Sequence, residues 1–387
     1  MPKITIYEKD ETGAKYTGDE IVVFVPGGCS AASGKSLDKN ECILIPEGAD
    51  ISKYLVEGSD SSYDYAKMLV DKGFQVVYCK KSADATLFES SWLKDKNQYN
   101  IKYLTTGVSG SLDTATETQT TEEASATKTV YNAMIELCNN RKDCIALIDT
   151  LSTASFDTYD KLLTAVQTVN DTEGRAALFA DWGYIDETKQ VKMPGSYFYL
   201  SALGDSVNAG KKWDAIAGVQ RGVVSDFVAP VNLNLSKYDL DNNVMNISTT
   251  AQSSYNGIVT IRPYGWTIWG DRTLRKNNST NGLKATSFLS IRVLVCDIAK
   301  RVYQSAINNT FESNSDVTWM NYKTYIAQLL DQMVADYKLA DYKILKLPSD
   351  RAAQIKCKIR LVPIEPVEDF DIYINLENAT ANIEEQG

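Results

Sequence analysis

The sequence of 387 residues predicts a protein of mixed α/β and α+β class. Three observations lead to this prediction. In the N-terminal half, short apolar runs alternate with segments of helical periodicity, which is typical of an α/β layer with a partly parallel sheet. In the C-terminal half, two long amphipathic segments are followed by one in which apolar and polar residues alternate. Both ends of the chain carry further short alternating segments, which are typical of β-strands.

Five apolar runs in the N-terminal half predict strands, because they are four or five residues long and rich in branched or aromatic side chains. They lie at 21–25, 42–45, 75–79, 144–148 and 176–180. Helices are expected between them at 124–140 and 158–169, where apolar residues recur at helical spacing. Residues 105–127 are rich in Thr, Ser and acidic side chains and poor in large apolar ones, which predicts a surface loop.

Two amphipathic helices are predicted in the C-terminal half, at 287–308 and 317–337, because their apolar residues recur every three or four positions. Asp316 is the expected N-cap of the second helix, since its carboxylate can accept a hydrogen bond from a free backbone N–H of the first turn. These helices are the longest elements that the sequence predicts with a single apolar face.

After these helices the apolar period changes from 3.6 to 2, which predicts strands with one buried face. The first strand has on its apolar face Ile355, Cys357, Ile359 and Leu361. The second, beyond the PIEP segment 363–366, has Phe370, Ile372, Ile374 and Leu376. The N-terminal KITIY repeats the pattern with Ile4 and Ile6. Both ends of the chain are therefore expected to form short strands.

Terminal strands of this kind have two interpretations. Either they complete the sheet of their own domain, or they add to the sheet of a neighbouring copy, because an unpaired strand edge is a template for pairing. One-directional exchange between identical copies does not close, so it builds a filament or a ring. The charge distribution is compatible with both. The last 25 residues hold seven acids and no base, and 262–301 holds eight bases and two acids. Such blocks either steer association or are solvated faces.

Composition excludes several classes of chemistry. The chain has no histidine, which excludes Ser-His-Asp and Cys-His catalysis and histidine metal sites. A net charge of −10 argues against a general nucleic-acid binder. The seven cysteines contain no CxxC pair and lie mostly in apolar runs, so we expect buried thiols in a reducing compartment. Without a signal-peptide core or a membrane-spanning apolar run, a soluble protein made in the cytoplasm is expected.

The segment PGGCSAASGKS, after the strand at 21–25, resembles a phosphate-binding loop. That loop needs four residues between its first Gly and the Gly-Lys pair, but five separate Gly28 from Gly34. It must also open a helix, and only LDKNE lies between Ser36 and the next strand at 42–45. A surface loop is therefore expected, and a nucleotide-binding α/β enzyme remains the alternative function. No spacing indicates a carboxylate pair of a hydrolase.

Three motifs in the C-terminal half follow one another in a recognisable order. The first runs from 193 to 222 and contains Trp-x-x-x-Ala-Gly and then Arg-Gly, with Trp213, Gly218 and Arg221. The second is Trp269-Gly270-Asp271-Arg272-Thr273-Leu274. The third is IRVLVCDIAKRVYQSA followed by Phe311-Glu312-Ser313-Asn314 and Trp319.

Together these motifs resemble the tail sheath proteins of contractile phage tails and contractile injection systems, over about residues 190–376. The family's first motif begins with a Pro-Ser-containing strand, matched here by Pro194 and Ser196. Ser313 departs from the family, where Pro is usual, and Val293-Leu294 replaces a common second Arg.

The chemistry of the motif residues favours structural roles over a ligand site. Gly270 permits close backbone approach or a positive φ. Asp271 and Arg272 can fix a turn through charge-assisted hydrogen bonds. Trp213 and Trp319 are expected to be core anchors.

The resemblance implies an inner, polymer-forming α+β domain with terminal strand arms and an inserted outer α/β domain. Its parts would be 1–25 (N-terminal arm and first inner strand), 26–194 (outer domain), 195–365 (inner sheath core) and 366–387 (C-terminal arm). It also implies that the two ends pair between copies and that 355–361 accepts a neighbour's strand.

The function implied by the resemblance is that of a non-enzymatic subunit without cofactors. Such a subunit polymerises around a tail tube and contracts to drive the tube through a bacterial envelope. Its partners would be itself, the tail tube protein, and baseplate and tail terminator proteins, with no direct nucleic-acid contact and no membrane insertion. Its location would be the virion tail or an equivalent particle, assembled in the cytoplasm of the bacterial host.

Overall fold

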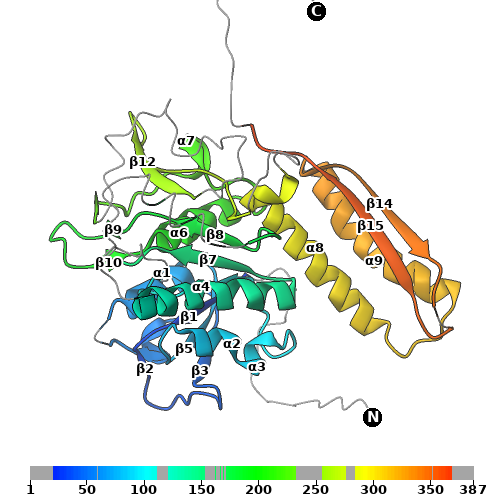
Figure 1. The fold of residues 1–387 in the computed structure, drawn as a ribbon, viewed down its shortest axis with the longest axis horizontal. Helices are drawn as coiled ribbons and strands as arrows, with labels where there is room; N and C mark the ends of the chain where they lie inside the picture. Colours follow the sequence, from blue (N-terminus) through cyan, green and yellow to red (C-terminus); the bar gives the residue numbers. More distant parts are fainter. Residues whose placement is uncertain are drawn as a thin grey trace, which may run out of the picture.

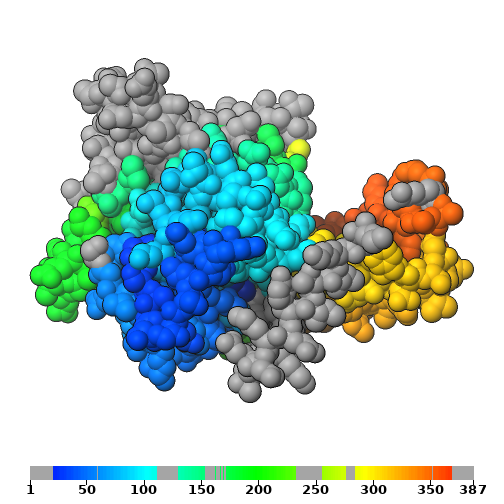
Figure 2. All heavy atoms as spheres, turned by 90° about the horizontal axis from the view of Figure 1, so that it is seen from below, coloured from blue at the N-terminus to red at the C-terminus, as the bar shows by residue number. Residues whose placement is uncertain are grey.

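The computed structural model describes residues 21–58, 60–110, 121–152, 162, 166, 169, 171–231, 255–275, 284–350 and 352–367, without the side chains of 121–129. Within this part of the chain we distinguish the body (21–288) and the projecting unit (289–363), which extends away from the body in Figures 1 and 2. The predicted terminal strands around Ile4 and Ile6 and at 370–376 lie outside the described residues.

The body is built on a six-stranded sheet with the strand order β3-β5-β1-β6-β7-β8. All neighbouring strands are parallel except β3, which runs antiparallel to β5. The strands are β1 (Val22–Pro26), β3 (Cys42–Ile45), β5 (Gln75–Cys79), β6 (Tyr103–Leu104), β7 (Ile145–Asp149) and β8 (Ala176–Phe179). The five predicted strands are confirmed, and the partly parallel α/β layer with them. The short strand β6 was not predicted.

Helices cover both faces of this sheet. The helices α1 (Ser62–Asp71) and α6 (Gly195–Asn208) bury side chains in one hydrophobic cluster, while α2 (Ala85–Glu89), α3 (Ser91–Lys94) and α4 (Thr121–Arg141) contribute to the other. Successive residues of β1 alternate between the two clusters, and all five are buried. A strand buried on both faces reads as a continuous apolar run, which is why 21–25 was readily predicted.

Smaller elements complete the body. A three-stranded sheet has the order β10-β9-β11, β12 pairs with β13, and β2 pairs with β4. The bounds are β2 (Ser30–Ala31), η1 (Ile51–Lys53), β4 (Leu55–Val56), β9 (Gly183–Tyr184), β10 (Lys192–Met193), α7 (Gly218–Arg221), β11 (Ala229–Pro230), β12 (Gly257–Ile261), β13 (Gly265–Trp269) and η3 (Ala285–Ser287).

The projecting unit consists of α8 (Leu289–Asn308), α9 (Asp316–Ala335) and an antiparallel hairpin of β14 (Leu339–Leu347) and β15 (Lys356–Pro363). In Figure 1, α8 leaves the body and α9 packs between α8 and the hairpin. The two long helices and the strand near 355–361 are confirmed. β14 was missed, because a bulge between Leu339 and Asp341 interrupts its alternation.

Three sequence expectations are wrong. The Pro-Ser strand at 194–196 is the start of helix α6, for which Pro194 is the N-cap. This helix is buried on nearly all sides, so its sequence has no single apolar face to mark it as helical. The loop expected at 105–127 ends earlier, because α4 begins at Thr121, and Thr105 and Thr106 are fully buried. The N-cap of α9 is Ser315, whose hydroxyl accepts from the backbone N–H of Thr318 at 3.2 Å; Asp316 is already helical.

Two further predictions, a helix and a domain boundary, can be compared with the described residues only in part. Of the helix predicted at 158–169, Leu162 and Val166 are helical and fully buried, and the rest lies largely outside the described residues. The predicted domain boundary after residue 25 falls within β1, whose neighbours β5 and β6 both belong to the segment assigned to the outer domain. The division into an inner and an outer domain remains a prediction.

Among the described helices, none combines the length and the apolar character needed to cross a membrane.

Candidate assembly site

The β14–β15 hairpin is the longest of the three two-stranded sheets in the described structure. Each strand pairs with the other, from Leu339↔Pro363 to Leu347↔Lys356, and neither has a second neighbour among the described residues. A two-stranded ladder leaves the backbone groups on both outer edges available for further pairing. At nine and eight residues, these strands are also longer than any strand of the body.

One face of the hairpin is closed by α9. Ile344 is 8% exposed, and the hydroxyl of Tyr322 lies 3.3 Å from the Sγ of Cys357. Trp319 is itself 8% exposed and stacks near Tyr322. The predicted acceptor residues are half-buried against the same cluster: Ile355, Cys357, Ile359 and Leu361. The hairpin is therefore packed on α9, and among the described residues neither of its outer edges has a neighbouring strand.

A buried ion pair holds the projecting unit against the body. The Nζ of Lys102, next to β6, lies 2.8 Å from a carboxylate oxygen of Asp297 on α8. The indole Nε1 of Trp213 donates to the same carboxylate at 2.7 Å. Burial alone would raise the pKa of Asp297, but the charges of Lys102 and Lys212 together with these hydrogen bonds hold it below its usual value. Trp213 thus anchors α8 through a hydrogen bond as well as through packing.

A second polar cluster joins the start of β14 to the body. The buried carboxylate of Asp214 forms ion pairs with Lys338 and, at 3.5 Å, with Arg221. Arg221 also donates from Nε to the carbonyl of Ala215 at 3.1 Å. Gly218 precedes this arginine with a φ of +70°, a conformation that favours glycine. The first motif therefore supplies the polar contacts that join the start of β14 to the body.

The Trp-Gly-Asp-Arg-Thr-Leu motif positions the N-terminus of α8. The carboxylate of Asp271 accepts from the backbone N–H of Ser290 at 3.0 Å and from the Ser290 hydroxyl. Gly270 has a φ of +123°, and the guanidinium of Arg272 lies 4.4 Å from the ring centre of Phe288. Trp269 ends β13 and packs on the second hydrophobic cluster. These contacts act on the helix start, where free N–H groups need acceptors.

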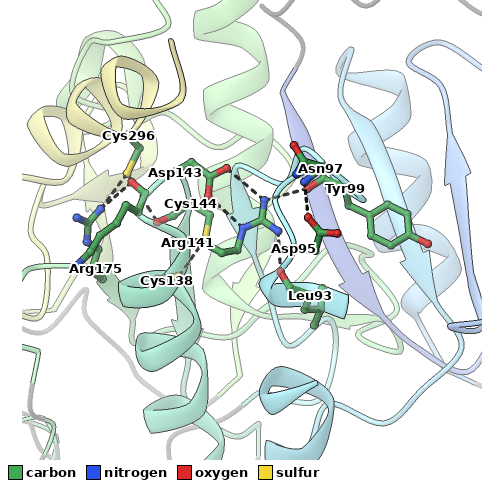
Figure 3. A network of polar contacts seen from close by, with 11 residues as sticks. Leu93, Asp95, Asn97, Tyr99, Cys138, Arg141, Asp143, Cys144, Arg175 and Cys296 are labelled. Carbon is green, nitrogen blue, oxygen red and sulfur yellow. Dashed lines mark hydrogen bonds and ion pairs between the residues drawn. The ribbon is translucent and has the colours of Figure 1, made fainter. Parts of the chain in front are cut away.

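A fully buried arginine joins α4 to the loop after α3, as Figure 3 shows. The guanidinium of Arg141 donates to the carbonyls of Leu93 (2.7 Å) and Tyr99 (2.9 Å) and to the carboxylate of Asp143 (3.1 Å). A buried charge of this kind is tolerated because its donors are satisfied. The same view shows three thiols, Cys138, Cys144 and Cys296, between α4, β7 and α8.

These thiols are packing residues. All seven cysteines are free and six are buried, as predicted. Burial raises the pKa of Cys138, and it raises the pKa of Cys296 to about 12, whereas a reactive cysteine needs a lowered pKa. In the described part of the chain, no group of three or more Cys, Asp or Glu side chains is arranged to hold a metal ion.

The phosphate-loop alternative finds no suitable geometry. Residues 33–36 are exposed and are followed by strand β3 without an intervening helix, as predicted. The Nζ of Lys35 lies 4.5 Å from the ring centre of Tyr54. Asp149, at the end of β7, accepts from the backbone N–H of Ser196 at 2.7 Å, and burial raises its pKa to about 7. An Mg²⁺-binding aspartate would instead be exposed and ionised.

A cleft of about 400 Å³ lies between strands β1, β3 and β5, the loop at 96–100 and the C-terminal half of α8. Its described lining contains no serine or cysteine that could act as a nucleophile. It contains two lysines, Lys96 and Lys300, and burial is the main cause that lowers the pKa of Lys300 to about 8. Its aspartate, Asp143, is held by Arg141. The described lining therefore offers polar contacts but no serine or cysteine beside a general base.

Sequence reasoning missed two parts of this site. β14 supplies half of the hairpin, and only the alternation of Tyr342 and Ile344 could have indicated it. The Lys102–Asp297 pair joins residues 195 positions apart, and no local pattern marks it.

Comparison with known structures decides the fold. A search of protein-family models returned no match, and a search of curated proteins also returned none. Among solved structures, the helical sheath of the anti-feeding prophage in its contracted state matches with a TM-score of 0.65 and 15% identity, over 97% of this chain and 99% of that one. This chain has the sheath fold.

Two further structures support the assignment of the sheath fold. The sheath complex of an extracellular contractile injection system, PVC, in its contracted state has a TM-score of 0.65 and 17% identity, over 97% of this chain and 98% of that one. The sheath tail protein of Listeria innocua has a TM-score of 0.52 and 7% identity, over 89% and 95%. The resemblance recognised from three motifs is therefore confirmed at the level of the fold, and it extends over nearly the whole chain.

Proposed function

We propose that this protein is a structural subunit of a contractile tail sheath, in a phage tail or a contractile injection system, and that it has no enzymatic activity. The single observation that carries the proposal is the match to sheath structures over nearly the full length of both chains. An enzyme on this fold would need an added site, and the described cleft and thiols lack suitable chemistry.

The subunit polymerises by strand exchange. The N-terminal segment around Ile4 and Ile6 and the C-terminal arm 366–387 have apolar residues at alternate positions, and the β14–β15 hairpin has edges without a neighbour among the described residues. Main-chain pairing supplies affinity, and the alternate side chains supply register. In this proposal β15 is the acceptor strand, and the terminal arms together with residues 195–365 form the inner domain.

Contraction is a transition between two packings of the polymer, with the contracted form lower in free energy. The strand links keep neighbours connected while other faces slide and repack. The polymer surrounds a tail tube, drives it through a bacterial envelope, and is bounded by baseplate and terminator proteins. No nucleotide is required at the moment of firing.

Deletion of residues 367–387 tests the proposal. We expect a folded protein with the melting temperature of the full chain that stays monomeric in size-exclusion chromatography and forms no tubes in negative-stain electron microscopy. Deletion of 378–387, which retains the alternating segment, is the matched control and should still assemble. Tubes of normal length from the longer deletion would refute the role of the C-terminal arm.

A further inference from the structure

Two cysteines lie directly opposite each other at the edge of the six-stranded sheet. Cys42 begins the edge strand β3, Cys79 ends its neighbour β5, and the two residues are partners in the antiparallel register. Their side chains point to the same face of the sheet, since both belong to the second hydrophobic cluster. Both are buried, free thiols. The fold therefore brings together two thiols that are far apart in the sequence.

The cysteines form a non-hydrogen-bonded pair of the antiparallel ladder. The N–H of Lys80 donates to the carbonyl of Glu41 at 2.9 Å, beside the pair. The backbone of Cys42 instead bonds to Asp38, whose carboxylate accepts from its N–H at 3.0 Å and whose N–H donates to its carbonyl at 2.8 Å. In such a pair the Cα atoms are about 4.5 Å apart and the side chains approach closely. That separation lies within the range that a disulfide spans.

The two sulfur atoms also converge on one acceptor. The Sγ of Cys42 lies 3.5 Å and the Sγ of Cys79 lies 3.6 Å from the carbonyl oxygen of Asn40. The hydrogen bond to Cys79, together with burial, raises the pKa of the Cys42 thiol. In the closed sheet this thiol is therefore protonated and unreactive.

Strand β3 is placed where the sheet can open locally. It has four residues and a single neighbour in the sheet, β5. Within it Ile43 is only half-buried and Leu44 is 50% exposed, and residues 33–36 before it are exposed. Segments with few buried contacts open at a lower free energy than the core of a domain. Opening of β3 exposes both thiols while the parallel strands stay paired.

A second pair of close thiols lacks such a route. The Sγ atoms of Cys138 and Cys144 are 3.5 Å apart. However, Cys138 lies in α4, and Cys144 directly precedes β7, an inner strand of the sheet. Both are fully buried, and no edge strand covers them. The pair at the sheet edge is therefore the one that can react while the body stays folded.

We infer that Cys42 and Cys79 are a redox-sensitive staple, which consists of free thiols in a reducing compartment and forms a disulfide when the protein meets a low-molecular-weight disulfide such as glutathione disulfide. The inference goes beyond the proposed function and does not depend on it. The disulfide would fix β3 to β5 and close a loop around segment 43–78, which contains α1.

The chemistry is two steps of thiol–disulfide exchange. When β3 opens, the thiolate of Cys42 attacks one sulfur of the oxidant, which forms a mixed disulfide and releases one glutathione thiolate. The thiolate of Cys79 then attacks the sulfur of Cys42, which forms the bond between the cysteines and releases the second glutathione. The two cysteine protons end on the two glutathione thiols. Two protein thiols are thus oxidised and one oxidant molecule is reduced.

Oxidation of the full-length wild-type protein tests the inference. After incubation of the folded protein with glutathione disulfide, alkylation and tryptic digestion without reductant, peptides 40–53 and 73–80 should be recovered as one linked species, two hydrogen atoms lighter than their sum. The melting temperature should rise by roughly 5 °C, because the link restricts the unfolded chain. Dithiothreitol should reverse both changes.

Cysteine variants assign the gain in melting temperature to this pair. Cys42→Ala and Cys79→Ala should each abolish the gain on oxidation. The matched control is C138A/C144A, which removes the other close pair and should keep both the linked peptides and the gain. Circular dichroism establishes that each variant is folded. The peptide analysis of the wild type requires no variant, so it decides the question even if a cysteine variant does not fold.

Four results would overturn the inference. They are thiols at 42 and 79 that stay reduced, a link that forms only once urea has unfolded the chain, a link between Cys138 and Cys144 in place of the edge pair, or a gain in melting temperature that persists in Cys42→Ala. Oxidation that instead joins two chains through half-buried Cys357 would give dimers in non-reducing electrophoresis without the linked peptides, and this would also overturn it. None of these results bears on sheath assembly, which the 367–387 deletion tests separately.

Discussion

The body and the projecting unit differ in how the outer edges of their sheets are covered. In the body, the outer edge of β8 is covered by the chain around Leu274, whose N–H donates to Ala176 at 2.7 Å. At the other edge, β3 has only four residues. In the projecting unit, two longer strands have uncovered edges within the described structure. Within the described residues, the sheet edges of the body are short or covered, whereas both edges of the hairpin in the projecting unit have no neighbouring strand.

The two regions also differ in how their charges are used. In the body and at its junction with α8, charged side chains are buried and paired, as with Arg141 and with Lys102–Asp297. On the hairpin, basic side chains are exposed and collected on one face. Buried pairs fix a single internal geometry, while exposed unpaired charges steer and register a partner.

The largest loss of stability is expected from a substitution in the body. Arg141→Met removes the donors for Leu93, Tyr99 and Asp143 and leaves Asp143 without its partner, at a cost of about 4 kcal/mol in the free energy of unfolding. Denaturant unfolding would measure this. Lys142→Met, at the exposed neighbouring position, should change stability by less than about 0.5 kcal/mol. Equal effects would mean that the buried network does not hold the body together.

A substitution in the Lys102–Asp297 ion pair, which joins the body to α8, should lower stability nearly as much. Asp297→Asn keeps the size of the side chain but leaves Lys102 buried without a counter-charge, costing about 3 kcal/mol at neutral pH. Hydrogen exchange should then increase in α8 and in the hairpin more than in β5 or β1. Uniform exchange throughout the chain would show that the two regions unfold as one.

This variant also has a defined pH dependence. The folded-state pKa of Asp297 is lowered, so its ionisation stabilises the wild type above the unfolded pKa of about 4 and is lost as the pH falls below it. The stability difference between wild type and Asp297→Asn should therefore shrink on acidification. A difference that stays constant from pH 6 to pH 2 would contradict the ion-pair assignment.

The smallest loss of stability is expected from substitutions at the N-terminus of α9, in the projecting unit. Ser315→Ala removes the hydroxyl that caps α9 and should cost about 1 kcal/mol. Asp316→Asn removes an exposed charge in the first turn and should cost only about 0.5 kcal/mol. Thermal unfolding of the two variants would distinguish the capping residue, and a larger effect at Asp316 would restore the original prediction.

The sequence allowed a good prediction wherever a single face of an element is buried. The periodicity of 287–308 and of 317–337 identified α8 and α9, and the alternation in 354–361 identified β15. Prediction from the sequence failed at α6, which is buried on nearly all sides, and at β14, where a bulge breaks the alternation. The motif residues Asp271 and Trp213 were noticed as a pattern, but nothing in it predicted that both would hold helix α8.

By itself, the sequence determined the character of this protein: a histidine-free chain, thiols in apolar runs, a phosphate-like loop of the wrong spacing, and ends in which apolar and polar residues alternate. Local patterns are sufficient for this, because period and spacing depend on near neighbours. Only the tertiary structure decided that Lys102 meets Asp297 across 195 residues, and that Lys343 stands against Arg360 beside an open edge. Such pairings depend on how distant segments pack, and no local pattern in the chain encodes them.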